Sequence, residues 1–362
     1  MAINQGLSHL SDHFLMVTLV LYFLAVLAFA ADFAFGRRSL AEPAEAAVPE
    51  LVTAGAAGAG AAVAAAGAAQ ASAADLARAT VDSATVDSAK ASGRTGRPAP
   101  ASRPSLRDAS FWVRAGLGLT VLGVIAHMAG VVSRGLAVHR VPWGDMYEFI
   151  IAVTCVAVLF FLGLMIRYRP FRLGLFFMAP IVIIIGLAQT VIYTPAGPLV
   201  PALNSYWLAI HVTAITLATG TYVVAAVLAV VYLVADRHAR RVAAGLPVRN
   251  GEVFRLLPTP ERLDQFAYRT VVFAFPLWTF GIMAGAIWAD EAWGRYWGWD
   301  PTETWAFITW VVYACFLHAR VTAGWRGRRA AYIQLVGFGC LLFNLLGVSL
   351  FITGLHSYAG LS

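Results

Sequence analysis

The sequence predicts an all-α polytopic membrane protein with about eight transmembrane helices and both termini outside. Three observations lead to this prediction: the composition, the length of the apolar runs and the placement of the arginines. Of the 362 residues, 60% are hydrophobic and 12% charged, and the mean hydropathy is +0.72. A water-soluble globule of this size cannot bury so much apolar surface, so a lipid bilayer is the expected solvent. The net charge of +7 lies in short clusters between apolar runs, which argues against nucleic acid as a partner.

Eight apolar runs are long enough to cross a bilayer, whose core of about 30 Å needs roughly 20 residues per helix. They lie near residues 14–35, 111–133, 146–166, 172–193, 206–235, 267–289, 303–322 and 330–353. The first run follows acidic Asp12 and lacks a small-residue cleavage site, so residues 1–36 are expected to be a retained transmembrane helix. The other seven would form a membrane domain over residues 111–362.

Arginine clusters set the expected orientation, because arginine favours the cytoplasmic side of a membrane. The clusters are Arg37 and Arg38; Arg167, Arg169 and Arg172; Arg237, Arg240 and Arg241; and Arg326, Arg328 and Arg329. The alternate connections carry few arginines. We therefore expect the loops near residues 134–145, 194–205 and 290–302 on the extracytoplasmic side of the cell membrane.

Residues 37–110 differ in kind from the rest of the chain. They are rich in Ala, Gly, Ser and Pro and contain the near-repeat ATVDSATVDSA from Ala79 to Ala89. This composition predicts a low-complexity cytoplasmic linker. The segment from Leu51 to Ala69 is apolar enough to suggest a ninth span, but it is almost entirely Ala and Gly, and an added helix would break the alternation of charge.

Aromatic side chains concentrate between residues 288 and 305. The cluster comprises Trp288, Trp293, Tyr296, Trp297, Trp299 and Trp305. Indole rings offer large rigid faces, and their N–H groups stay available to polar partners. A belt at the lipid headgroup level would also concentrate Trp and Tyr. Because Gly294 and Gly298 interleave this cluster and permit close backbone approach, a platform for a flat aromatic ligand is favoured.

The end of the aromatic segment also predicts the start of a helix. Asp300 is a good N-cap, Pro301 suits the first helical position, and Glu303 stands where a capping-box carboxylate belongs. Asp300 is thus a candidate for the cap, for ligand contact, or for both, since a cap would fix the orientation of the platform.

Histidines within or at the edge of membrane spans are candidate functional residues. His211 lies near the outer end of the fifth predicted helix and His356 just beyond the outer end of the eighth, at the level of the tryptophans. Two such histidines could ligate a haem iron through neutral imidazole. His318, about 25 Å along the seventh helix, is too deep to join them. It could ligate a second haem, for which His127 is a candidate second ligand.

The propionates of a haem need cationic partners. Arg295 in the tryptophan loop and Arg134 and Arg140 in the first outer loop are the few outward arginines. They are candidate propionate contacts, although contact with lipid headgroups would explain them equally well.

These motifs together resemble the CcsA/ResC family of System II cytochrome c biogenesis, often labelled CcsB in actinobacteria. This family belongs to the haem-handling superfamily that includes CcmC and CcmF. The segment W-G-R-Y-W-G-W-D-P-T-E-T-W at Trp293–Trp305 is similar to the WWD signature. The segments at Ser205–Val212, Phe316–Arg320 and Gly354–Ala359 resemble the three histidine motifs, and Pro142–Phe149 resembles the outer-loop motif. The resemblance covers roughly residues 110–362, more weakly the first span, and not the linker.

The resemblance implies that His211 and His356 are outer axial ligands of haem b and that His318 is a transmembrane haem ligand. It also implies that the WWD segment is the haem platform and that a ResB-type membrane partner supplies the other transmembrane histidine. The chain would be a component of a cytochrome c synthase that presents haem to the CxxCH segment of apocytochrome c. Two positions depart from the pattern, with Thr302 where Lys is common and Asp145 where Asn is common.

Three other functions remain open from the residues alone. A haem exporter would release haem without forming thioethers. A b-type electron-transfer subunit would stack paired histidines within the bundle. A non-haem assembly scaffold would bind no pigment.

Overall fold

The structure is a computed structural model that describes residues 3–35, 109–198, 205–248, 251–255, 257–352 and 354–356. The predicted linker and the candidate ninth span at Leu51–Ala69 fall outside the described residues, apart from the short stretch that leads into the second helix. The sidedness of the termini is not tested and stays a prediction.

Within the described part of the chain, eight helical spans are long and apolar enough to cross a membrane, which confirms the predicted number. The long helices are α1 Gln5–Phe35, α2 Phe111–Val138, α3 Met146–Tyr168, α4 Gly174–Val191, α5 Tyr206–Ala243, α7 Pro260–Trp293, α8 Pro301–Val321 and α9 Arg328–Leu342. A 3-10 turn, Phe171–Leu173, leads into α4, and a π-helical turn, Phe343–Val348, extends α9. The short helices are α6 Gly251–Arg255 and α10 Ser349–Phe351.

Several helices run beyond the predicted spans. Helix α1 begins at Gln5, α5 continues through its arginine-rich end to Ala243, and α7 extends from Pro260 to Trp293. Hydropathy indicates only the part of a helix that lies in lipid, whereas the backbone hydrogen-bond ladder continues into the polar flanks. The predicted centres were therefore correct, and several predicted ends were too short.

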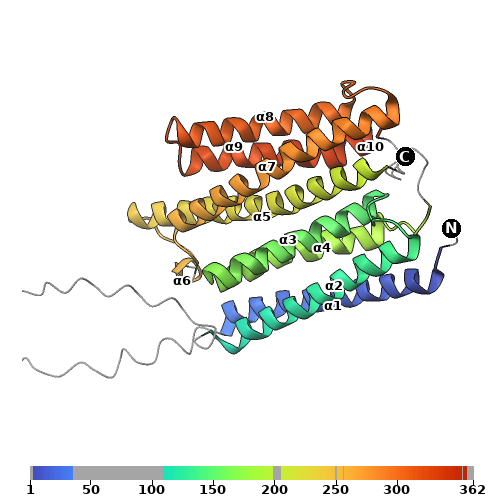
Figure 1. The fold of residues 1–362 in the computed structure, drawn as a ribbon. Helices are drawn as coiled ribbons and strands as arrows, with labels where there is room; N and C mark the ends of the chain where they lie inside the picture. The colour runs from blue at the N-terminus through green and yellow to red at the C-terminus, as the bar shows by residue number, and fades with distance from the viewer. Residues whose placement is uncertain are drawn as a thin grey trace, which may run out of the picture. The chain divides into compact units, whose positions relative to one another are not determined.

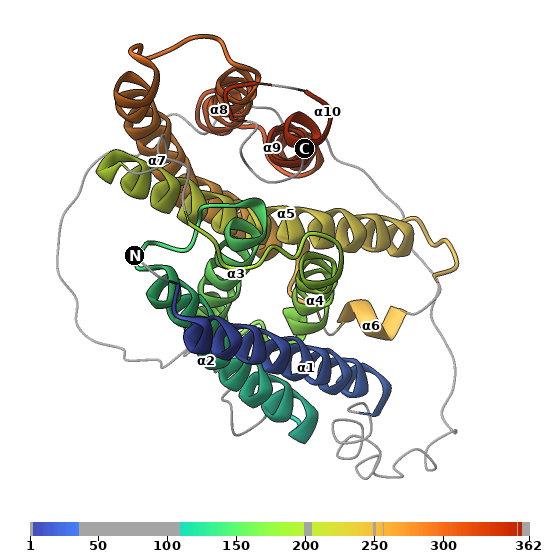
Figure 2. The same cartoon turned by 90° about the vertical axis from the view of Figure 1, so that its right-hand side faces the viewer.

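The helices pack as successive pairs (Figures 1 and 2). Helices α1 and α2 form one close pair, α3 and α4 lie between that pair and α5, and α5 packs along α7. Helices α8 and α9 lie beyond, where α8 contacts α7, α9 and the π-helical turn. Helix α5 therefore joins the two halves of the bundle, because it contacts α3, α4, α7 and α9.

Small residues allow α1 and α2 to approach closely. Gly123 and Gly130 lie seven residues apart on α2, and a Cβ atom at these positions would fall 2.5 Å from the Tyr22 ring and 2.9 Å from Leu15. Close backbone approach through small residues is a common device in membrane bundles, where van der Waals packing replaces the hydrophobic effect between helices. Larger residues here would push the pair apart.

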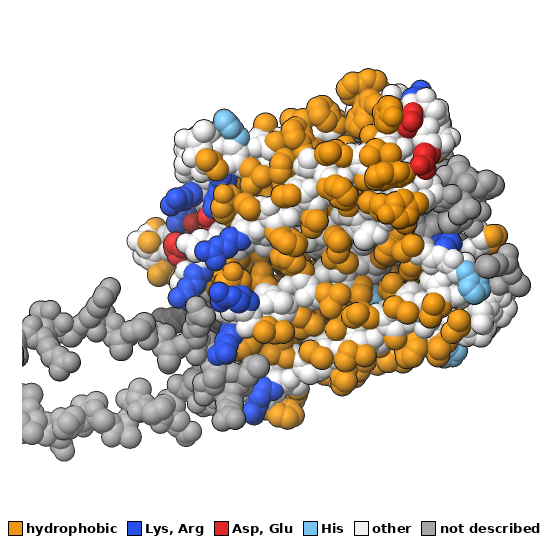
Figure 3. All heavy atoms as spheres, viewed as in Figure 1, with side chains coloured by type: hydrophobic (Ala, Val, Ile, Leu, Met, Phe, Trp, Pro, Cys, Tyr) orange, Lys and Arg blue, Asp and Glu red, His pale blue; other side chains and the backbone are white. Residues whose placement is uncertain are grey.

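The outer surface suits a lipid environment. Figure 3 shows apolar side chains spread along the sides of the helices and basic side chains gathered toward one end. Ile125, Phe280 and Met283 are 58%, 50% and 60% exposed, which would be costly over so wide a surface in water. This distribution is that of a multi-pass membrane protein.

Candidate functional site

His211 projects from α5 toward α7, where its imidazole Nδ1 lies 2.7 Å from the backbone carbonyl oxygen of Gly281. A carbonyl oxygen only accepts hydrogen bonds, so Nδ1 carries the proton and donates it. Nε2 is therefore the nitrogen that a metal would take. A second bond of this kind fixes the tautomer and the ring orientation of most metal-ligating histidines.

A glycine face on α7 makes room for this ring. A Cβ atom on Gly285 would fall 2.6 Å from both Cε1 and Nδ1 of His211, and one on Gly281 would fall 2.6 Å from Ile215. The two glycines are four residues apart and lie on one side of the helix. The sequence interpretation missed them, although the Gly-x-x-x-Gly spacing was a signal of close helix approach.

His356 lies in the segment after α10 and is held by Asp300. Its Nδ1 is 2.7 Å from Asp300 Oδ2, and the backbone N–H of Leu355 donates to Asp300 Oδ1 at 2.7 Å. The carboxylate thus binds the backbone and the ring of adjacent residues. As at His211, Nδ1 is the engaged nitrogen, so a metal would bind Nε2, as in a carboxylate–histidine–metal triad.

Asp300 also caps α8, as the sequence predicts. Its side chain accepts from the backbone N–H of Thr302 at 3.2 Å, and Glu303 closes the capping box by accepting from the N–H groups of Asp300 and Gly298 at 3.1 and 2.9 Å. Burial alone would raise the pKa of Asp300, but the hydrogen bonds from His356, Leu355 and Thr302 outweigh burial and lower it. The carboxylate therefore stays ionised and available to His356.

Trp288 and Trp293 pack with these two histidines. The Trp288 side chain is 1% exposed, and its ring centroid lies 6.2 Å from that of His211, nearly parallel at 11°. It lies 5.9 Å from His356 and 4.8 Å from Trp293, and Trp293 lies 5.0 Å from His356. The structure therefore brings both predicted outer histidines to one aromatic centre, from α5 and from the end of the chain.

The other members of the aromatic cluster lie apart from this centre. Trp297 contacts Trp299 edge-on at 5.7 Å, while Trp305 packs on Phe343 of the π-helical turn at 4.3 Å. Tyr296 and Trp299 are 59% and 67% exposed. Trp299 has a φ of 56°, an uncommon left-handed conformation for a bulky residue. The cluster is thus divided into a part that contacts histidine, an exposed part and a part that packs on the last helix.

His318 and His127 are not brought together. His318 is exposed on α8, whereas His127 is buried on α2, where its ring meets Tyr22 of α1 edge-on at 5.9 Å. Figures 1 and 2 show α8 and α2 on opposite sides of the bundle. The arrangement gives His127 a packing role beside Tyr22 and leaves the side chain of His318 at the surface.

Two of the three candidate propionate arginines are bound by Glu148 at the start of α3. Glu148 Oε1 lies 2.9 Å from Arg134 Nε, and Oε2 lies 2.7 Å from Arg140 Nη1. The side chains of Glu148, Arg134 and Arg140 are 0%, 2% and 13% exposed. Arg295 is exposed in the tryptophan loop, with its guanidinium over Gly298. The sequence interpretation noted the motif that contains Glu148 but not the ion pairs that it forms.

Asp145, which departs from the expected Asn, caps α3 beside this cluster. Burial, and secondly the neighbouring Glu148 carboxylate, raise its pKa to about 6 against the smaller opposing effects of the Glu148 backbone N–H, Arg134 and Arg140. Two arginines here face three carboxylates, because Asp12 also lies 3.7 Å from Arg134. Ionisation of Asp145 therefore opposes folding, and stability falls as the pH rises from about 4 toward 6.

Asp145→Asn is accordingly expected to stabilise the chain above pH 6 and to have little effect below about pH 4, because Asn caps a helix as well as Asp does. The measurement is the free energy of unfolding of the detergent-solubilised chain at pH 8 and pH 4 for both forms. An equal difference at the two pH values would contradict the prediction.

The chain is similar in sequence to proteins named for cytochrome c biogenesis. It is 38% identical over 269 residues to "Cytochrome c biogenesis protein CcsA" of Guillardia theta, covering 68% of this chain and 86% of that protein. It is 41% identical over 198 residues to the protein of the same name in Synechococcus elongatus, covering 45% and 61%.

The fold is similar to that of a solved "Cytochrome c Heme Lyase CcmF", with a TM-score of 0.57 at 15% identity. The match covers 95% of this chain but spans only 47% of the lyase. The family model described as "Cytochrome C assembly protein" matches residues 143–356, from the loop before α3 to His356 itself. The chain therefore belongs to the cytochrome c assembly protein family, within its CcsA group.

Proposed function

We propose that this chain acts in cytochrome c maturation by binding haem b at the outer ends of α5 and α7, with His211 and His356 as axial ligands. The observation that carries the proposal is the convergence of two oriented histidines on Trp288. Gly281 fixes one ring and Asp300 fixes the other. Each hydrogen bond is made through Nδ1, so each ring would ligate iron through Nε2.

The surroundings of these histidines suit haem as a substrate. Trp288 and Leu208 form a small buried cluster, and the partly buried Trp207, Val212 and Trp293 packed against it would offer apolar and aromatic contact to a porphyrin face. Side chains from several elements meet here, and each histidine ring is held by a hydrogen bond to a group outside its own segment. The site could therefore hold a porphyrin in a fixed orientation.

In this proposal the exposed rings of Tyr296 and Trp299 receive the apocytochrome c segment that carries the CxxCH motif. Each thioether forms when a substrate thiol S–H adds across a haem vinyl C=C bond, so both thiols come from the substrate. The chain would contribute positioning, which can supply a large part of the rate when the reacting groups are held close. The histidine of the substrate would then replace one protein ligand.

His318 fits a second role in the same process. It is exposed on α8, the helix with the fewest buried residues among the eight spans of the described chain. A ResB-type membrane partner that packs against α8 could bring a histidine to His318, and haem would then enter from the cytoplasmic side and reach the outer site. The separation of His318 from His127 supports a partner, rather than this chain, as the source of that ligand.

The test is to purify the chain with and without a ResB-type partner, record its haem spectrum and repeat with His211→Ala, His356→Ala and the double variant. We expect each single variant to lose the outer bis-histidine spectrum and the double variant to lose cytochrome c maturation, while His139→Ala, in the loop after α2, changes neither. Unchanged haem content and maturation in the double variant would overturn the outer-ligand assignment. Haem release without thioether formation would instead identify an exporter.

A further inference from the structure

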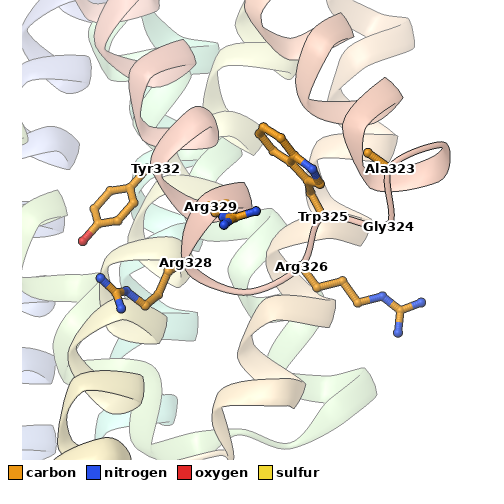
Figure 4. A pocket seen from close by; sticks show the side chains of 7 residues that line it. All are labelled: Ala323, Gly324, Trp325, Arg326, Arg328, Arg329 and Tyr332. Atoms are coloured by element: carbon orange, nitrogen blue, oxygen red, sulfur yellow. The ribbon is translucent and has the colours of Figure 1, made fainter.

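A hollow of about 670 Å³ lies at the loop between α8 and α9, on the side expected to be cytoplasmic. Its lining residues are Ala323, Gly324, Trp325, Arg326, Arg328, Arg329 and Tyr332. Figure 4 shows Arg329 below the Trp325 indole, with Arg328 on one side and Arg326 on the other. The hollow is far along α8 from the aromatic centre, because α8 is capped by Asp300 at its start and ends at Val321, next to the hollow.

The three arginines of this hollow are not neutralised by the described residues. No carboxylate in the described part of the chain forms an ion pair with any of them, although Arg320 close by is bound by both oxygens of Asp264 at 2.8 and 2.9 Å. Arg329 instead lies over the Trp325 ring at 5.9 Å, in a cation–π contact. The hollow therefore has an excess of positive charge that a bound anion would neutralise.

The loop that carries these arginines is held in a defined shape. The Trp325 backbone N–H donates to the Ala319 carbonyl at 3.0 Å, and the Gly327 N–H donates to Asp264 Oδ1 at 3.3 Å. Gly324 and Gly327 have φ values of 61° and 70°, which other residues rarely adopt. Asp264 thus anchors both Arg320 and the loop, so the guanidinium groups extend from a fixed backbone.

The position of the hollow indicates which class of anion would bind there. It lies where two membrane spans meet, and apolar residues continue from it along α9: Tyr332 is 53% exposed and Val336, four residues later, is 58% exposed. Side chains four residues apart lie on one face of a helix. A lipid bound here would place its phosphate among the arginines and an acyl chain along Tyr332 and Val336.

We propose that the α8–α9 hollow is a binding site for the phosphate headgroup of an anionic phospholipid. Arginine suits this ligand because its guanidinium donates two parallel hydrogen bonds to phosphate oxygens. The proposal is independent of haem binding, since it rests on residues that take no part in the outer site.

The test compares phosphatidylglycerol and phosphatidylcholine binding to the full chain by native mass spectrometry from micelles that contain both lipids. Arg326→Gln with Arg329→Gln is expected to weaken phosphatidylglycerol binding by about tenfold and to leave phosphatidylcholine binding unchanged. The matched control is Arg237→Gln with Arg241→Gln, which removes two exposed arginines from the end of α5. This control should bind phosphatidylglycerol as the natural chain does.

An equal loss in the control pair, or no loss in the hollow pair, would overturn the site. Inorganic phosphate distinguishes a site for a lipid headgroup from a site for free phosphate. If inorganic phosphate displaces phosphatidylglycerol at equal concentration, the hollow binds a free anion and the lipid assignment is wrong. If the double variant does not fold, Arg329→Lys serves instead. It keeps the charge but loses the two-pronged contact, and its affinity should fall between those of the natural chain and Arg329→Gln.

Discussion

Glu148→Ala is expected to lower the free energy of unfolding by about 3–5 kcal/mol, because it removes the one carboxylate that binds both the buried Arg134 and the partly buried Arg140 guanidinium. Glu148 accepts from Arg134 at 2.9 Å, from Arg140 at 2.7 Å and from the Gly144 backbone N–H at 2.8 Å. An unpaired buried charge costs far more than the loss of an exposed ion pair. The measurement is the unfolding of the detergent-solubilised chain in an SDS titration.

The control for Glu148 is Glu261→Ala, which removes an exposed carboxylate from the first turn of α7 and should cost about 0.5 kcal/mol or less. The double variant Glu148→Gln with Arg134→Gln should lose less stability than Glu148→Gln and Arg134→Gln lose in sum when each is made alone. The reason is that the two residues are directly paired. Additive costs would show that Glu148 does not stabilise the fold through Arg134.

Asp300→Asn is expected to weaken haem binding by about 10–100-fold while changing stability little. Asn can still cap α8. The substitution nevertheless removes the negative charge that holds His356 at 2.7 Å, and it replaces the carboxylate that also accepts from the Leu355 backbone N–H. Asp300→Ala should lose both functions and additionally cost about 1 kcal/mol of stability. The measurements are haem titration by absorbance and unfolding of the same samples.

The matched control for Asp300 is Asp290→Asn, the same change in a carboxylate of the last turn of α7. It should retain haem affinity. The free energy of unfolding measured over a pH series gives a second readout. Folding lowers the pKa of Asp300, so the stability contributed by its ionised carboxylate is complete above the ordinary Asp pKa. This contribution disappears as the pH falls through the lowered pKa. Equal haem affinity in Asp300→Asn and the natural chain would show that His356 needs no carboxylate.

Patterns along the chain predicted much of this structure. Eight spans follow from apolar run length, and the cap at Asp300 and Glu303 follows from local hydrogen-bonding chemistry that needs no distant partner. His211 and His356 were placed at one level because each lies near the end of a span, and the structure brings them to the same tryptophan. Features that depend on position within one helix were therefore predictable.

Contacts between helices were not predictable in the same way. Hydropathy does not specify which helix face meets which, so it could not place His211 against Gly281 and Gly285 of α7. It also could not assign Arg134 and Arg140 to Glu148, because ion pairing depends on how α2 and α3 pack. The division of the tryptophans arises from the turn at residues 294–300, where Trp299 adopts a left-handed conformation that no composition rule predicts.

The π-helical turn at Phe343–Val348 makes the last span sensitive to the insertion or deletion of a residue. A π turn contains one more residue than an α turn, and each residue of a helix advances the chain by about 100° of rotation. The direction in which residues 354–356 leave the bundle thus depends on how many residues precede them, as well as on which ones they are. Side-chain exchanges in the last span can be tolerated where a one-residue deletion cannot, because a deletion would rotate His356 away from Asp300.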